Sequence, residues 1–421
     1  MTTTINNEHK KLNVPNLRFP EFQGEWERCK VSDLLDFYST NSLSWDKLEY
    51  GTDAIQNLHY GLIHVGLPTM IDLGKDKLPN ITNGNTPKNY EFCQEGDIAF
   101  ADASEDTNEV AKAVEFYKLN GKDVICGLHT IHGRDNQQKT VVGYKGYAFS
   151  STTFHHQIRR IAQGTKIYSI NSKNFSECYI GIPSKGEQKK IATLLRLIDE
   201  RIATQNKIID KLQSLIKGLN DSLYAQYGGE VLTSFANLGT SYSGLSGKSA
   251  QDFGSGKPFI TYLNVYSNNV INEKDFQLVA IKDNEKQNVV EYGDVLFTLS
   301  SETPEEVGIG SVYLGKDEVF LNSFCFGIHI TNTEMAFPPY LSYYVSSTPF
   351  RKFIYPYAQG STRFNLCKAD FEKASIKLPS LENQKCIYSV LKRIASKIET
   401  EKNILGLYNF QKRYLLRQMF I

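Results

Sequence analysis

Two stretches of the chain carry apolar side chains at the alternating three- and four-residue spacing of an amphipathic helix. The first stretch follows Pro183 and is interrupted only at Gln205. Its apolar positions are Ile191, Leu195, Ile198, Ile202, Ile209, Leu212, Ile216, Leu219 and Leu223. Because Gly228-Gly229 is a stop signal, the pattern predicts one helix of about 37 residues, or roughly 55 Å.

The second stretch ends the sequence and is interrupted at Glu401, which matches Gln205, and at Lys412. Its apolar positions are Ile387, Leu391, Ile394, Ile398, Leu405, Tyr408, Leu415 and Met419. We expect this helix to continue to Ile421. Two such helices in one chain most simply pack on each other, and an antiparallel pair would place two globular heads at opposite ends. The alternative is that each helix lies along its own domain, which the long heptad continuity disfavours.

The segments that precede these helices are two copies of one unit. Five identical residues recur with a constant separation of 196 positions. They are Gly164, Phe175, Pro183, Gln188 and Ile191 in the first copy and Gly360, Phe371, Pro379, Gln384 and Ile387 in the second. Upstream, the segment 95–100 matches 292–297 with an offset of 197, a drift that loop insertions would leave. The chain is therefore a tandem duplication.

Before each helix, β-branched and aromatic residues alternate with glycine, asparagine and serine, which predicts short strands and turns. We therefore expect an α+β fold with two tandem globular domains, each followed by a long helix, and the two helices packed as an antiparallel coiled coil. The expected divisions are an N-terminal extension over 1–20, a first globular domain over 21–183, a central helix over 184–227, a second globular domain over 228–379 and a C-terminal helix over 380–421.

Three motifs that suggest catalysis or phosphate binding are incomplete. Phe337-Pro338-Pro339-Tyr340 resembles the motif of an adenine methyltransferase, but Phe337 replaces the required polar residue, so we predict a turn leading into a helix over 340–346. Gly247-Lys248-Ser249 lacks the earlier glycine of a phosphate-binding loop, since Tyr242 stands there. Glu187-Gln188-Lys189 fits a nuclease pattern, but it begins a helix, where a carboxylate complements the helix dipole.

The cysteine and histidine spacings do not indicate a metal site. The seven cysteines are odd in number and none forms a C-x-x-C pair, which favours reduced thiols in a cytoplasmic protein. His129 and His132 would point to opposite faces of a strand, and no third ligand of suitable spacing is evident. No apolar run reaches the ~20 residues of a membrane span, and the start, Met1 to Lys11, is not signal-like.

Taken together, the repeated motifs resemble the specificity subunit of type I restriction–modification systems. The opening from Val14 to Phe22, with Trp26, is similar to the usual entry of that family. So are the twice-used block of Gln-Gly-Thr/Ser, Phe, Ile/Leu-Pro and Gln, and the Gly-Asp-x-x-Phe segments at Gly96 and Gly293. The second copy departs slightly, because Glu187-Gln188 becomes Glu382-Asn383-Gln384.

The resemblance implies a division of labour between two target-recognition domains, each reading one half of an asymmetric, bipartite DNA sequence. The helix pair would set the gap between the halves. Two modification subunits would methylate adenine at N6, and motor–nuclease restriction subunits would cleave unmodified DNA. S-adenosylmethionine, ATP and magnesium would belong to those partners, so that this chain would be non-catalytic and hold neither cofactor nor metal.

DNA contacts must come from local surface, because the net charge is only +1, with 47 basic and 46 acidic residues. Residues shared by both copies are expected to be scaffold, whereas residues that read bases should differ between the copies. Donor-bearing candidates are Lys88, Asn89, Arg134, Asn136, Lys139, Lys145 and Arg159 in the first copy and Lys248, Tyr262, Asn264, Thr362 and Arg363 in the second. Arg159 and Arg363 flank the shared Gln-Gly turn and are candidates for phosphate contacts. A rival hypothesis is a coiled-coil adaptor with two protein-binding heads.

Overall fold

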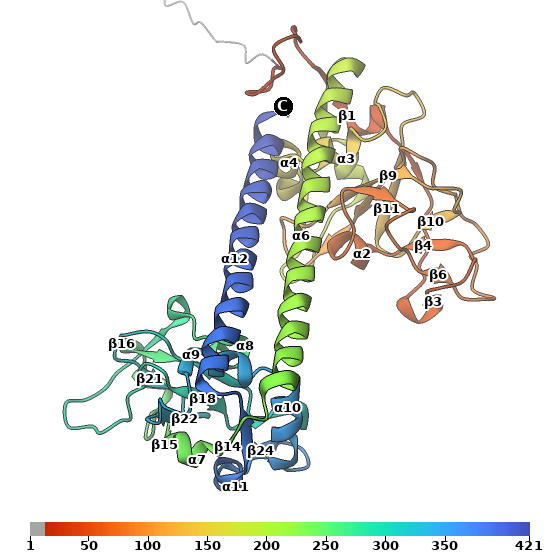
Figure 1. Ribbon diagram of the computed structural model, residues 1–421. Helices are drawn as coiled ribbons and strands as arrows, with labels where there is room; N and C mark the ends of the chain where they lie inside the picture. Colours follow the sequence, from red (N-terminus) through yellow and green to blue (C-terminus); the bar gives the residue numbers. More distant parts are fainter. Residues whose placement is uncertain (1–12) are drawn as a thin grey trace, which may run out of the picture. The chain divides into compact units, whose positions relative to one another are not determined.

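The two predicted long helices are the dominant elements of the computed structural model, which describes residues 13–421 (Figure 1). Helix α6 spans Lys185–Tyr227 and helix α12 spans Leu381–Gln418. Both are confirmed, although α12 ends at Gln418 rather than at Ile421. Met419 and Phe420 leave the helix and are buried in a hydrophobic core. In the described part of the chain, no helix is long and apolar enough to cross a membrane.

The chain divides into two compact units, and each unit contains one head and part of each long helix. Unit 1 comprises the described residues up to Asn206 together with Asn403–Ile421, and unit 2 comprises Lys207–Lys402. Of the predicted N-terminal extension, residues 1–12 lie outside the described residues. Both heads have a mixed α/β fold (Figure 1).

In unit 1, a five-stranded sheet with the order β2-β11-β7-β9-β5 lies beside a four-stranded sheet with the order β10-β4-β6-β3. The first sheet is made of β2 (Asp36–Tyr38), β11 (Thr130–Arg134), β7 (Ile98–Ala101), β9 (Ala113–Lys118) and β5 (Met70–Asp72). The second is made of β10 (Val124–Cys126), β4 (Gln56–Leu58), β6 (Asn80–Ile81) and β3 (Leu48–Glu49). Two-stranded pairs join β1 (Glu27–Lys30) to β13 (Tyr179–Ile182) and β8 (Ala103–Ser104) to β12 (Tyr168–Ser169). The short helices are α1 (Val31–Leu34), α2 (Tyr60–His64), α3 (Lys145–Phe149), α4 (Thr152–Ile161) and α5 (Ser172–Ser176).

Unit 2 repeats this plan with fewer strands. Its main sheet has the order β15-β22-β18-β20 and is made of β15 (Gly239–Ser243), β22 (Cys325–Ile330), β18 (Val295–Thr298) and β20 (Gly310–Val312). A second sheet joins β17 (Gln277–Val279), β16 (Phe253–Ile260) and β21 (Phe320–Leu321). The remaining strands are β19 (Ser300–Ser301), β24 (Phe364–Leu366), β23 (Ala358–Gln359), β14 (Val231–Thr233) and β25 (Ile376–Leu378). The short helices are α7 (Phe235–Leu238), α8 (Tyr262–Ser267), α9 (Pro338–Tyr344), α10 (Thr348–Ile354) and α11 (Lys368–Lys373).

The apolar seams of the long helices pack into the core of each unit. In unit 1, Ile191 and Leu195 of α6 share a hydrophobic cluster with Leu415 of α12. In unit 2, Ile387 and Leu391 of α12 share a cluster that includes Leu219 of α6. Burial of such side chains stabilises each by about 1.5–3 kcal/mol relative to exposure, so each helix is held on both sides by its head and by the other helix.

Lys412, one of the polar interruptions of the seam, has a specific partner. Its Nζ lies 2.7 Å from Asp199 Oδ1 of α6, within unit 1. Asp199 also accepts a hydrogen bond from the Tyr147 hydroxyl of the head. An ion pair at this position fixes the register in which the two helix segments meet, as polar seam residues do in coiled coils.

The two shared glutamines have identical structural roles. Gln188 Oε1 accepts a hydrogen bond from the Val141 backbone, and its Nε2 donates to the Lys139 and Pro183 carbonyls. Gln384 does the same with the Phe337 backbone and the Met335 and Pro379 carbonyls. Both side chains are fully buried. Each glutamine therefore ties the start of its long helix to its own head. For this pair, the prediction that residues common to both copies form the scaffold is confirmed.

The shared aspartates of the Gly-Asp-x-x-Phe segments also anchor equivalent turns. Asp97 Oδ2 accepts a hydrogen bond from the Gln94 backbone, and Asp294 Oδ2 accepts one from Glu291. Both carboxylates are buried. In unit 1 the neighbouring side chains are Arg134 and Tyr38, which pack on each other, and in unit 2 they are Tyr242 and His329, whose rings stack. These motifs therefore hold the central strand of each sheet rather than facing outward.

Candidate nucleic-acid interface

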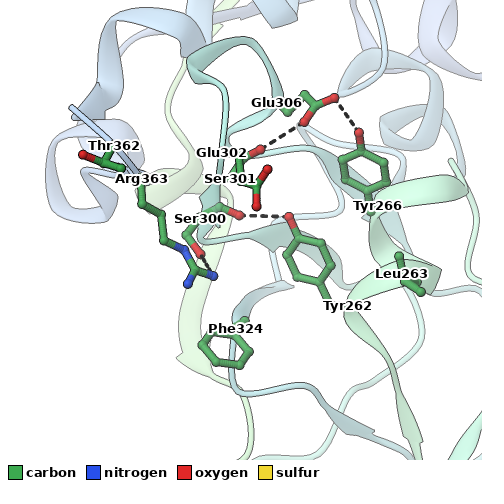
Figure 2. Close-up of a pocket in the computed structure, with 10 residues that line it drawn as sticks. All are labelled: Tyr262, Leu263, Tyr266, Ser300, Ser301, Glu302, Glu306, Phe324, Thr362 and Arg363. Atoms are coloured by element: carbon green, nitrogen blue, oxygen red, sulfur yellow. Dashed lines mark hydrogen bonds between the residues drawn. The ribbon is translucent and has the colours of Figure 1, made fainter. Parts of the chain in front are cut away.

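Unit 2 carries a hollow of about 980 Å³ whose walls come from α8, β19, the loop before β22 and the turn before β24 (Figure 2). Its lining residues are Tyr262, Leu263, Tyr266, Ser300, Ser301, Glu302, Glu306, Phe324, Thr362 and Arg363. Leu263 is 69% exposed and Phe324 is 55% exposed, so both contribute apolar surface to the hollow. The hollow thus combines apolar surface with one guanidinium and two carboxylates.

Helix α8 is positioned by local hydrogen bonds on both sides. The Thr261 side chain accepts a hydrogen bond from the Asn264 backbone and caps the helix. The Tyr262 hydroxyl donates to the Ser300 carbonyl at 2.9 Å, and the Tyr266 hydroxyl donates to Glu306 at 2.7 Å (Figure 2). Burial of the Tyr262 ring raises the pKa of its hydroxyl. The hydrogen bond from Tyr266 lowers the pKa of Glu306, which therefore stays ionised at neutral pH.

A tight turn places Arg363 at the edge of the hollow. Gly360 has φ +144°, and a Cβ added there would lie far inside van der Waals contact with the Arg363 carbonyl oxygen. Arg363 donates a hydrogen bond to the Ser300 hydroxyl at 3.2 Å, and its guanidinium lies 5.8 Å from the centre of the Phe324 ring. Its side chain remains exposed. The turn therefore holds the Arg363 guanidinium, with its several N–H donors, at the edge of the hollow.

Unit 1 has the same backbone frame with different side chains. Gly164 has φ +143°, and a Cβ there would meet the Ile167 carbonyl oxygen, so Ile167 takes the place of Arg363. Strands β8 and β12 pair as β19 and β24 do. Tyr60 of α2 takes the place of Tyr262, and its ring lies 5.2 Å from that of His129, which by sheet register takes the place of Phe324.

A second hollow of about 500 Å³ lies beside His129. It is lined by Thr40, Asn41, Ser42, Leu43, Pro87, Lys88, Asn89, Leu128 and His129. His129 is exposed, and its Nδ1 lies 3.2 Å from Asp102 Oδ1. The two heads thus carry related surfaces whose polar groups are not the same.

Comparison with known proteins agrees with this architecture. The model of the family described as "Type I restriction modification DNA specificity domain" matches residues 77–214 and 245–406, which together make up more than half of the chain. This chain belongs to that family. DNA sequence recognition for a type I restriction–modification system is therefore its function, and its two matched segments are two DNA specificity domains.

Individual relatives share the whole length of the chain. A protein of Methanocaldococcus jannaschii described as a type I restriction enzyme MjaX specificity subunit is 24% identical, over 94% of this chain and 92% of its own length. A solved type I restriction–modification S subunit of M. genitalium has a TM-score of 0.51 at 15% identity and covers 97% of this chain and 99% of its own. A chain from a structure on complex assembly and conformational transition of the type I system has a TM-score of 0.59 at 14% identity and covers 93% and 96%. At these identities, the solved structures show a common fold.

Five of the predicted DNA-contacting residues lie at the two hollows. Tyr262, Thr362 and Arg363 come together at the hollow of unit 2. Lys88 and Asn89 lie together at the hollow of unit 1, and both are exposed. Their role in binding DNA stays a prediction.

Four other predicted residues are buried and engaged with partners inside their own heads. Arg134 bonds to Asp97 and Glu91, and Lys145 lies 3.5 Å from Glu115 with its side chain 3% exposed. The Lys248 side chain is 5% exposed and donates to the Ala280 carbonyl and to Glu285. Asn264 donates to the Asn272 carbonyl. The structure corrects the prediction for these four residues, because a buried and satisfied side chain presents no donor to a base edge.

The remaining three candidates are at least partly exposed, but each has a hydrogen-bond partner in its own head. Asn136 is exposed, but its amide donates to Asp36 and to the Tyr38 hydroxyl. Lys139 is partly exposed and donates to the Asp33 carbonyl. Arg159 donates to Asn108 and contacts His156. Surface hydrogen bonds of this kind can exchange for contacts with DNA, so these residues keep their place as candidates.

Several residues of the hollow escaped the sequence prediction. Phe324, Leu263 and Tyr266 carry no basic or amide donor. Glu302 has an identical residue, Glu105, at the offset of 197, and identical residues were expected to form the scaffold. Phe324 could have been found by comparing the two copies at an offset of 195. This is the offset between His129 and Phe324 that the pairing registers of β11 and β22 give.

The motifs that suggested catalysis are explained by structural roles. Helix α9 begins at Pro338 and is fully buried, which confirms the predicted turn into a helix. Glu187 lies in the first turn of α6, where a carboxylate was expected. Its buried carboxylate accepts hydrogen bonds from Arg18 and Trp26, so it ties the entry segment to the helix.

Proposed function

We propose that this chain reads an asymmetric, bipartite DNA sequence, with one half-site contacted by each head. The observation that carries this proposal is the pair of related surfaces on one backbone frame with different side chains at Ile167 and Arg363, and at His129 and Phe324. A frame that keeps its position relative to the duplex while its side chains vary is suited to reading two different base sequences.

The chemistry of the unit 2 hollow suits major-groove base edges. An arginine fork matches the two acceptors of guanine, and a carboxylate accepts from the amino group of cytosine. Arg363 and the exposed Glu302 supply these groups side by side. The exposed rings and Leu263 supply apolar contact for a thymine methyl group or a sugar.

In unit 1, a hollow that includes His129, the counterpart of Phe324, offers a different set of donors. Lys88 and Asn89 lie with His129 at one hollow. Asparagine matches the donor and acceptor of adenine, and lysine suits guanine or phosphate. An unlike pair of half-sites follows from these unlike sets.

We also propose that α6 and α12 pack as an antiparallel pair that separates the half-sites. The support is that the start of α6 shares a core with the end of α12 in unit 1, whereas the end of α6 shares one with the start of α12 in unit 2. Half-sites read from one face of a duplex lie about one helical turn apart, roughly 34–36 Å, and helices of this length are long enough to set that gap.

We assign DNA methylation and cleavage to partner subunits. We propose that two modification subunits bind the chain and methylate adenine at N6, that restriction subunits join them, and that S-adenosylmethionine, ATP and magnesium bind to those partners. The chain itself would be non-catalytic.

The test is a selection from randomised duplexes by the chain in complex with its modification subunits, read at two salt concentrations. The proposal predicts enrichment of two unlike short motifs at a fixed gap, with binding that weakens as salt rises. An adaptor with protein-binding heads would instead retain a protein partner at high salt and enrich no motif, and that result would contradict the proposal.

A further inference from the structure

Three side chains that can ligate a metal meet in the core of unit 1. They are Cys93, Cys126 on β10 and His132 on β11, and all three are buried. Their ligand atoms lie within 4.8 Å of one another. Cys93 lies 33 positions before Cys126, and the six positions from Cys126 to His132 match no familiar metal-binding spacing, so the sequence predicted no metal.

The distances fit a tetrahedral metal ion. The Cys93 and Cys126 Sγ atoms are 3.6 Å apart, too far for a disulfide bond, which requires about 2.0 Å. Zinc binds cysteine sulfur at about 2.3 Å, and two sulfurs on a tetrahedral zinc ion are therefore roughly 3.8 Å apart. The thiol pair thus already has the separation that zinc requires.

His132 is oriented as a metal-binding histidine. Its Nε2 is hydrogen-bonded to Asp97 Oδ2 at 2.7 Å, and its buried Nδ1 has no hydrogen-bond partner. A carboxylate that holds one ring nitrogen fixes the orientation and tautomer of the ring, so that the other nitrogen can donate its lone pair to a metal. An unpartnered buried nitrogen is costly unless something binds it.

The local charges also favour a dication. The Asp97 carboxylate is compensated by Arg134, whose Nε and Nη2 both donate to it. Two cysteine thiolates would then add two negative charges that no described neighbour balances. A divalent ion bound between them would balance the two thiolates, and buried charges persist only when they are paired or bind a metal.

The second head provides an internal control. By strand register and backbone hydrogen bonds, Val290 matches Cys93, Leu321 matches Cys126 and Gly327 matches His132. None of these three residues of unit 2 can bind a metal through its side chain. The corresponding space in unit 2 is filled by apolar side chains and by the Tyr242 ring, which packs against Gly327. The Tyr242 hydroxyl donates to Asp294 Oδ2 in place of the histidine.

We infer that Cys93, Cys126 and His132 Nδ1 bind one zinc ion in the core of the first head, with a solvent molecule as its fourth ligand. The ion would join β10 and β11 to the segment that leads into β7. The second head achieves the same packing with Val290 and Leu321. The inference does not depend on DNA recognition, because its readout is metal content.

The experiment measures zinc per chain by elemental mass spectrometry in the purified full-length protein. We expect about one zinc per chain, and less than a tenth of that in Cys93→Val and Cys126→Leu, which introduce the residues of the second head. Cys325→Val, which removes a buried cysteine of unit 2, is the matched control and should retain the ion. A zinc content that is unchanged by Cys93→Val would overturn the inference.

A second measurement on the unsubstituted chain keeps the test independent of how the variants fold. After removal of zinc, Co²⁺ should bind with the intense visible absorption of a tetrahedral thiolate site. Folded protein that takes up neither ion, or that contains an intact Cys93–Cys126 disulfide by mass spectrometry, contradicts the inference.

Discussion

At the scale of residues, the hairpin turn after Gly164 and Gly360 combines a shared backbone conformation with side chains that differ between the copies. The glycine is common to both copies because its backbone conformation excludes a side chain, whereas the residue three positions later is Ile167 in one copy and Arg363 in the other. Arg363 is exposed and held in place by Ser300 and Phe324. Pre-orientation of this kind lowers the entropy lost when a guanidinium binds a base.

Replacement of Arg363 by alanine should weaken binding of the cognate duplex and relax one base position in the half-site read by unit 2. Loss of one bidentate base contact corresponds to about 1–3 kcal/mol, or roughly a 5- to 150-fold change in Kd. Fluorescence anisotropy with the cognate duplex and single-base variants measures both effects. Lys352→Ala, which removes an exposed lysine on α10 of the same unit, is the control and should change neither. Equal effects of the two substitutions would argue against base contact by Arg363.

The buried glutamines provide a prediction about stability. Gln384→Ala leaves a buried backbone N–H and two carbonyls without their partners, and each unsatisfied group costs about 1–3 kcal/mol. We expect a lowered free energy of unfolding of about 3 kcal/mol or more, measured by urea denaturation, and a similar loss for Gln188→Ala. Gln411→Ala, on the exposed face of α12, should be within ~0.5 kcal/mol of the unsubstituted chain. If Gln384→Ala is as stable as that control, the anchoring role assigned to the glutamines is incorrect.

Residue type alone did not reveal which basic groups face solvent. Arg134 and Lys145 were predicted to be DNA contacts, but they neutralise Asp97 and Glu115 inside unit 1. Their partners are more than 29 positions away in the sequence, so only the fold brings the charges together. Lys88, by contrast, is exposed, and its contact with DNA stays a prediction.

At the scale of elements, sequence periodicity predicted the long helices well and the strands poorly. Both helices carry an apolar stripe that follows the helical period over many turns, with polar residues only at Gln205, Glu401 and Lys412. Helix α6 ends at Tyr227, directly before the predicted stop. The strands are mostly two to six residues long and many are buried on both faces, so the alternation that identifies a strand has little length in which to appear. Helix α12 ends at Gln418 rather than at the predicted Ile421, because Met419 and Phe420 are buried in the core of unit 1.

The hairpin before β24 can be tested as an element. Gly360→Ala introduces a Cβ that collides with the Arg363 carbonyl oxygen, so the turn must open and Arg363 must move. We expect reduced recognition of the half-site of unit 2 alone, measured by binding to duplexes in which one or the other half-site is scrambled. Gly406→Ala, where nothing lies within 4 Å of the new Cβ, should leave binding unchanged. A loss of both half-sites would indicate general unfolding rather than a local role of the turn.

At the scale of the whole molecule, two unlike heads are linked in one chain by α6 and α12. We propose that the duplication provides a common frame, that the divergence of surface side chains provides two specificities, and that the helix pair sets the gap. The sequence supported this organisation because a repeated unit ending in a helix can be recognised without knowing any strand boundary. The details of each surface required the fold, since each hollow is assembled from three or more segments distant in sequence.

The gap should respond to helix length. Insertion of one heptad into α6 and one at the paired position of α12 lengthens the pair by about 10 Å, which corresponds to roughly three base pairs of DNA. Selection from randomised duplexes should then recover both unchanged half-sites at the longer gap. A heptad inserted into α6 alone should abolish coordinated recognition, because the seams no longer match. Recovery of the original gap with both insertions would contradict a spacing role for the helices.

The most direct test of the central claim is single-molecule sequencing of DNA from cells that co-express this chain with a cognate modification subunit. The account predicts N6-methyladenine at one split, asymmetric motif, with Arg363→Ala altering only one of its halves. The absence of new methylation, in cells that contain the assembled complex and a DNA pool rich in sequence variety, would contradict the claim that the two heads read DNA.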